Sequence, residues 1–118
     1  MEPKEKLDLA VRAADDKQAH QIVTLNMGDV SLVADYFVIC HGNSETQVEA
    51  IAREVKSRAA LAGLDVKRLE GINEARWVLI DLDDVIVHVF HKDEREYYNL
   101  EKLWGDAPTV DLQEILQA

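Results

Sequence analysis

The chain has 118 residues, 47% of them hydrophobic, which is typical of one compact domain that folds without disulfides or structural metals. Acidic residues outnumber basic ones by 23 to 13, and the net charge of −10 disfavours binding to bare nucleic acid or to an anionic membrane. The single cysteine, Cys40, excludes an intramolecular disulfide framework, and together with the lack of a long apolar segment it predicts a cytoplasmic protein.

The first third of the chain predicts a surface helix and two strands. An apolar stripe with helical spacing predicts a helix over residues 4–16 that packs on a sheet. Residues 22–25 form a short run that is rich in β-branched side chains, which indicates a strand. Residues 36–40 lack any polar alternation, which is typical of a central strand buried on both faces. The helical stripe consists of Leu7, Ala10, Val11 and Ala14.

A second helix is predicted from its start and stop signals. Ser44 and Gln47 have the S-x-x-Q spacing of a capping box, and Gly63 supplies a left-handed stop. A further strand is predicted over residues 65–69, and the order strand, helix, strand predicts a right-handed parallel crossover between residues 36–40 and residues 66–69. The predicted inward face of the helix consists of Val48, Ile51, Ala52, Val55 and Ala59.

The next part of the chain predicts an antiparallel hairpin. Two strand-like runs, residues 77–82 and 85–90, are separated by Asp83 and Asp84 alone. Because one connection is predicted parallel and the other antiparallel, we expect a mixed sheet.

The last predicted helix begins at Asp93, which has Glu96 three residues later as in a capping box, and it continues through residue 104. Gly105 and Pro108 end it. Its expected core stripe is Tyr97, Leu100 and Trp104. Beyond it, residues 109–118 carry a weak apolar pattern that fits either a docked helical turn or a frayed end.

One pattern suggests catalysis. Gly42, Asn43 and Ser44 form a loop before a predicted helix, where backbone N–H groups can hold phosphate. Asp81 and Asp83 alternate onto one strand face, where two carboxylates can hold magnesium. A magnesium-dependent nucleotidyl transferase or nucleotide-binding domain is therefore one alternative. The other is a helix cap and a solvated acidic turn, which such residues form more often.

The histidines do not have the spacing of a metal site. His88 and His91 are three apart on a predicted strand and so point to opposite faces, and only the fold could bring His20 or His41 to either of them. We therefore predict no metal site. Cys40 ends an apolar run and is predicted to be a core residue rather than a nucleophile.

A series of short motifs runs in order along nearly the whole chain, from Leu7 to Pro108. In this combination they resemble the ribosomal silencing factor family, also called Iojap-like proteins. The motifs are Asp35-Tyr36-Phe37-Val38-Ile39, Gly42-Asn43-Ser44 with Gln47, Ile51-Ala52, Gly71 with Trp77, Asp81, His88-Val89-Phe90, Arg95, Tyr98, Leu100-Glu101, Leu103-Trp104 and Asp106-Ala107.

The resemblance implies an α/β fold with a mixed sheet of about five strands flanked by helices, similar to nucleotidyl transferases but without their activity. It therefore implies no catalytic residue and no cofactor. Residues 1–108 would form this domain and residues 109–118 a C-terminal tail. The family resemblance also implies binding to the large ribosomal subunit at ribosomal protein L-fourteen. There the bulk of the domain would block the small subunit and repress translation, notably in nutrient limitation.

The predicted contact surface follows the edge between the strand at residue 77 and the final helix. Trp77 is open to two interpretations, a buried edge residue or an interface hot spot. An aromatic and aliphatic centre would be desolvated on binding, and carboxylates would meet Lys or Arg of a basic partner. The predicted contact residues are Trp77, Asp81, Asp83, Arg95, Tyr98, Leu100 and Glu101.

Other partners follow from charge and strand exposure. We expect no membrane contact and no direct sequence-specific binding of nucleic acid, because the acidic domain would be repelled by phosphate groups. A homodimer through the strand near residues 65–70 is one further arrangement that the sequence allows.

Overall fold

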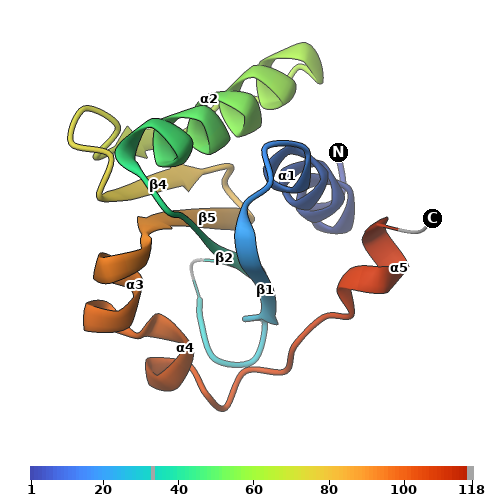
Figure 1. Ribbon diagram of the computed structural model, residues 1–118. Helices are drawn as coiled ribbons and strands as arrows, with labels where there is room; N and C mark the ends of the chain where they lie inside the picture. Colours follow the sequence, from blue (N-terminus) through green and yellow to red (C-terminus); the bar gives the residue numbers. More distant parts are fainter. Residues whose placement is uncertain (33, 117–118) are drawn as a thin grey trace.

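The computed structural model describes residues 1–32 and 34–116, and its five-stranded sheet carries helices on both faces (Figure 1). Helices α1 and α2 cover one face, whereas α3 and α4 lie on the other. The strands are β1 (His20–Asn26), β2 (Tyr36–Gly42), β3 (Arg68–Glu70), β4 (Trp77–Asp81) and β5 (Val85–His91). The helices are α1 (Pro3–Asp16), α2 (Glu45–Leu61), α3 (Lys92–Tyr98), α4 (Leu100–Leu103) and α5 (Leu112–Leu116).

The strand order is β1-β2-β5-β4-β3, and β2 and β5 are the parallel pair. The other neighbouring pairs are antiparallel, including the predicted hairpin of β4 and β5. The expected mixed sheet flanked by helices is therefore confirmed. Its likeness to nucleotidyl transferases stays a prediction from the family resemblance.

The predicted crossover joins β2 and β3, which run parallel in the sheet but are not neighbours. In the structure β2 pairs with β5, and β4 and β5 lie between β2 and β3. Burial explains why β5, and not β3, lies next to β2, because residues 85–90 of β5 are all buried and need neighbours on both sides. The short β3 has exposed ends, Arg68 and Glu70, and so occupies an edge.

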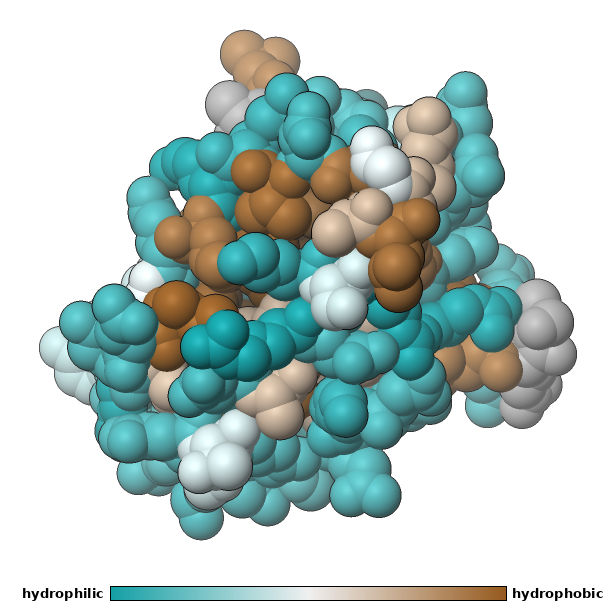
Figure 2. Space-filling model, turned by 90° about the horizontal axis from the view of Figure 1, so that it is seen from above, coloured by the Kyte–Doolittle hydropathy of each residue, from teal (hydrophilic) through white to brown (hydrophobic). Residues whose placement is uncertain are grey.

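The face under α1 and α2 holds the larger core, and both predicted helical stripes are fully buried there. Ser44 caps α2 as predicted, since its Oγ accepts the backbone N–H of Gln47 at 3.1 Å. The Gln47 side chain instead accepts the N–H of Asn43, one residue before the expected position. Seen from above, the molecule is mostly hydrophilic, with hydrophobic side chains gathered towards the middle (Figure 2). Within the described residues no helix is suited to crossing a membrane.

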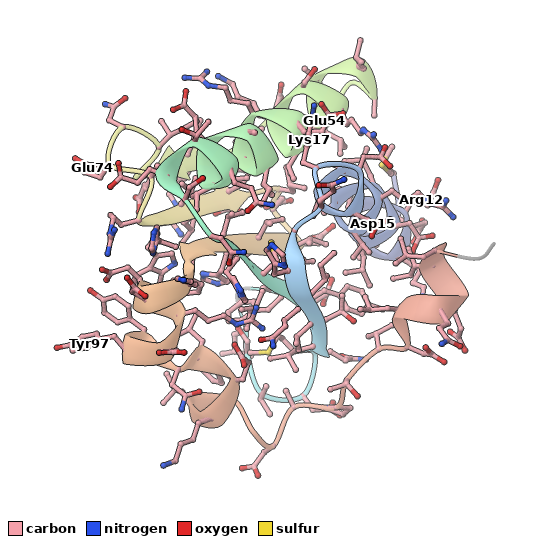
Figure 3. The ribbon with its side chains drawn as sticks, in the orientation of Figure 1. Arg12, Asp15, Lys17, Glu54, Glu74 and Tyr97 are labelled. Atoms are coloured by element: carbon pink, nitrogen blue, oxygen red, sulfur yellow. The ribbon has the colours of Figure 1, made fainter. Side chains whose placement is uncertain are left out.

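The last predicted helix is two helices. Asn99 adopts a left-handed backbone conformation, with φ of 48°, and separates α3 from α4. The N-cap is His91 rather than Asp93, since His91 Nδ1 accepts the N–H of Asp93 at 3.2 Å. Because the helix is interrupted at Asn99, Tyr97 does not share a helical face with Leu100 as predicted. Tyr97 is 81% exposed rather than in the core, and its side chain points away from α3 (Figure 3).

The C-terminal segment docks along the β1 edge. The N–H of Asn26 donates to Pro108 O at 2.7 Å, and the N–H of Val110 donates to Thr24 O at 2.9 Å. Ile115 of α5 is then buried in the core that α1 shares. Of the two predicted forms of the tail, the docked turn is the one observed over residues 112–116, and its last two residues lie outside the described part of the chain.

Candidate functional site

Part of the second sheet face is left open by α3 and α4. Trp77, Leu79 and Asp81 of β4 point to this side and are half-buried, whereas the residues between them are fully buried on the other side. Arg68 and Glu70 of β3 extend the surface to the sheet edge. We call these five side chains, together with Tyr98 of α3, the open face. A groove of about 250 Å³ is hollowed in it between Glu70, Gly71, Trp77 and Leu79.

An aromatic group forms the centre of the open face. The rings of Trp77 and Tyr98 lie 4.6 Å apart between centroids, and the Trp77 ring stacks on Phe90 at 5.0 Å. The indole N–H of Trp77 donates to Nδ1 of His88 at 3.2 Å. Tyr98 keeps 44% of its surface exposed. Phe90 and His88 therefore hold the Trp77 ring on its buried side, while the aromatic group of Trp77 and Tyr98 still reaches solvent. An interface anchor needs both properties.

The predicted acidic residues lie at the other end of β4. Asp81 is four residues from Trp77, which is about 13 Å along a strand. Its carboxylate accepts the N–H of Asp83 at 2.8 Å and pairs with Arg68 at 3.3 Å. Asp83 is exposed in the turn before β5. The fold therefore separates these carboxylates from the aromatic centre.

Arg95 and Leu100 are buried and hold the two short helices on the sheet. Arg95 Nε donates to Glu101 at 2.8 Å, and its Nη1 lies 2.9 Å from His41 Nδ1 and 3.3 Å from His20 O. Burial is the largest cause that lowers the pKa of His41, and the charge of Arg95 is the next. Nδ1 of the neutral His41 ring accepts a hydrogen bond from the Arg95 guanidinium. Leu100 is part of the small core on this face. Of the predicted contact residues Arg95, Leu100 and Glu101, only Glu101 is partly exposed.

The catalytic pattern is not assembled. Gly42 lies at the end of β2 beside His91, whereas Asp81 lies beside Ile86, so the loop and the carboxylates are at opposite ends of the sheet. Along the strands the two sites are about 16 Å apart. Ser44 and Asn43 are engaged within the chain as the cap of α2. The alternative prediction, in which this loop and these carboxylates form one nucleotidyl transferase site, is therefore wrong.

A hollow at the start of α1 and the acidic and histidine side chains of the described residues do not form a catalytic site either. The hollow has a volume of about 320 Å³, but its lining carries two carboxylates, of Glu2 and Asp35, against the one cation of Lys4, which disfavours a phosphate. Among the described residues, no group of three or more His, Cys, Asp or Glu side chains is arranged to hold a metal ion. Cys40 is fully buried as predicted, and burial raises the pKa of its thiol to about 12.

The loop before β4 positions Trp77. Gly71 has φ of +83°, and a Cβ there would overlap the carbonyl oxygen of Trp77. Arg76 ties the loop to α3 through Glu94 at 2.9 Å. The structure also adds Leu79, Glu70 and His88, which were not among the predicted contact residues. Strand alternation could have found Leu79, whereas Glu70 and His88 require the register between strands.

Comparisons with known proteins show what the chain is similar to. A family model described as "Ribosomal silencing factor during starvation" matches residues 1–118. The "Ribosomal silencing factor RsfS" of Halalkalibacterium halodurans is 66% identical over 116 residues, which cover 98% of this chain and 99% of that protein. The protein of the same name from Bacillus subtilis is 64% identical over 112 residues, 95% of each chain. A crystal structure from Chromobacterium violaceum, at 35% identity, has a TM-score of 0.87 and covers 89% of this chain and 88% of that one.

Proposed function

Because the chain belongs to the family of ribosomal silencing factors, as its motifs predict, we propose that it binds the large ribosomal subunit through ribosomal protein L-fourteen. Bound there, it blocks association with the small subunit and represses translation, notably in nutrient limitation. The protein acts in the cytoplasm, without an enzymatic step, a metal or a cofactor.

The observation that carries the proposal is the aromatic centre of the open face with acids around it. Trp77 and Tyr98 supply apolar area, Glu70 is exposed at the groove that Trp77 lines, and Glu101, three residues after Tyr98 in the chain, is partly exposed. A basic protein surface complements this arrangement, and the net charge of −10 steers such a partner towards it. The same charge disfavours ribosomal RNA as the contact.

The predicted contact residues divide by exposure. Trp77, Tyr98 and Glu101 can touch a partner together with Leu79. Asp81 and Asp83 would meet the partner at the far end of β4. The two buried members, Arg95 and Leu100, support binding by holding α3 and α4 in place.

Exclusion of the small subunit needs only volume. The domain measures 33 × 31 × 28 Å along its principal axes. An object of this size at a surface where two subunits meet keeps them apart for as long as it stays bound. Repression would then follow the fraction of large subunits that are occupied.

Sedimentation with separated subunits tests the proposal. We expect the protein to travel with large subunits and to reduce the joined ribosome peak in proportion to occupancy. Trp77→Ala and Tyr98→Ala should each weaken binding by about 2 kcal/mol or more. Leu61→Ala is the matched control, because Leu61 is an exposed hydrophobic residue at the end of α2. Unchanged binding by both aromatic variants would contradict the surface, and unchanged subunit joining at saturation would contradict the function.

Self-association is a separate part of the proposal. β3 forms one edge of the sheet and its end residues are exposed, which supports a homodimer through this strand. The opposite edge is covered by the C-terminal segment. Light scattering across a dilution series should show the mass rise with concentration, and a constant monomer mass would exclude the dimer.

A further inference from the structure

We propose that His88 is a positioning residue for the open face: its Nδ1 accepts the indole N–H of Trp77 and fixes the indole against Tyr98. This inference rests on the proposed function for its purpose, because it explains why an interface anchor is held still. The hydrogen bond itself can be tested in the free protein.

The geometry defines the protonation of the imidazole. Trp77 Nε1 lies 3.2 Å from His88 Nδ1, and an indole nitrogen can only donate. The Nδ1 atom of His88 must therefore be the acceptor, and the ring proton of the neutral imidazole lies on Nε2. In the register of β4 and β5, His88 lies opposite Leu79 and diagonal to Trp77, so the indole leans along β4 towards Leu79 to reach it.

The surroundings of His88 indicate that this residue serves the hydrogen bond to Trp77 rather than the stability of the fold. The residue is 5% exposed, and its ring contacts Phe37 edge to face at 4.8 Å between centroids and lies near Phe90 at 6.3 Å. Its Nε2 has no hydrogen-bond partner among the described residues. An imidazole with an unpaired nitrogen in an aromatic shell is unfavourable for folding. What it supplies, and what an apolar side chain would lack, is the acceptor for Trp77.

The acceptor also persists at neutral pH. Burial lowers the pKa of His88 to about 4, so the ring stays neutral and Nδ1 keeps its lone pair. Without it, the half-buried indole N–H would turn towards water and the ring would leave its contact with Tyr98. An anchor held in its bound orientation loses less entropy on binding.

The first test uses the free, full-length protein labelled with ¹⁵N, in a Trp104→Phe background that leaves Trp77 as the one indole. We expect His88 to carry its proton on Nε2 and the Trp77 indole N–H to be protected from hydrogen exchange. His88→Leu should speed that exchange by about fivefold or more, whereas His88→Asn, which can place an amide oxygen near the position of Nδ1, should preserve protection. A proton on Nδ1, or an indole signal unaffected by His88→Leu, would overturn the proposal.

The second test measures binding to large subunits. His88→Leu should weaken binding by about fivefold, and His88→Asn should restore most of it. In a Trp77→Phe background, which lacks the indole N–H, the two His88 variants should bind equally well. An equal loss from His88→Leu in both backgrounds would mean a merely structural role and would refute positioning. If the parent protein does not bind large subunits, the proposed function fails, and the indole measurement still decides the role of His88.

Discussion

Two glycines in the left-handed region differ in what surrounds them. Gly63 follows α2 with φ of +78°, and a Cβ there would meet no atom within 4 Å. Gly71 has a similar angle, but a Cβ there would overlap the carbonyl oxygen of Trp77. The first position therefore needs glycine for its backbone angle alone, and the second also for space.

This difference gives a matched pair of substitutions. Gly63→Ala should lower the free energy of unfolding by about 1 kcal/mol, which is the strain of the left-handed angle. Gly71→Ala should lower it by clearly more and should shift the fluorescence of Trp77, because the loop must move away from the start of β4. Urea unfolding followed by fluorescence measures both effects. Equal losses for the two variants would show that the loop accepts the extra carbon.

His88 should also make stability depend on pH. Its pKa is about 4 in the folded protein and 6.5 when unperturbed, so between these values the unfolded chain binds more protons. Stability must then rise with pH in this window, and the lowered pKa of His41 acts in the same direction. From pH 7 to pH 4 we expect His88 to account for a loss of about 3 kcal/mol.

The control separates His88 from the carboxylates that also titrate in acid. His88→Leu should lose less stability over the same pH interval, and the difference between the two urea series isolates the imidazole. Parallel pH curves for the parent and His88→Leu would contradict a neutral buried ring.

At the scale of elements, local signals predicted which segments form strands and helices. The buried run in β2, the hairpin of β4 and β5, and the inward face of α2 were all correct. The parallel crossover from β2 to β3 has the predicted direction, but the strands that lie between them were not predicted, because pairing depends on how much each distant strand must be buried and not on the order of the chain. The break at Asn99 was also missed, since the side chains on both sides continue a helical pattern.

The docking of α5 allows a prediction at this scale. Ile115 is 2% exposed and packs in the core beneath α1, and Arg12 Nη2 donates to its carbonyl oxygen at 2.5 Å. Ile115→Ala should lower the free energy of unfolding by about 2 to 3 kcal/mol. Gln113→Ala is the control, because Gln113 is exposed on the same helix. Urea unfolding measures the free energy of unfolding of both variants. If Ile115→Ala loses no more stability than Gln113→Ala, α5 contributes little to the core.

At the scale of the whole molecule, the fold assembles a surface that the sequence shows only in pieces. Trp77 and Tyr98 were predicted as separate candidates, and the structure brings their rings into contact. Asp81, predicted with them, lies at the other end of β4, and Arg95 lies beneath the helices. Such sorting depends on register and burial, which are properties of the assembled sheet rather than of any local pattern.

The distribution of charge gives a prediction for the whole molecule. Glu70 lies on the open face, whereas Glu114 is exposed on α5 at the opposite side of the sheet. Substitution of either by Lys changes the net charge equally. If the open face meets a basic partner, Glu70→Lys should slow association with large subunits by about threefold more than Glu114→Lys at low salt. Stopped-flow mixing with labelled subunits measures this rate. The difference should vanish near 1 M salt, where the screening length is about 3 Å. Equal slowing by both variants would mean that total charge, and not the open face, guides the encounter.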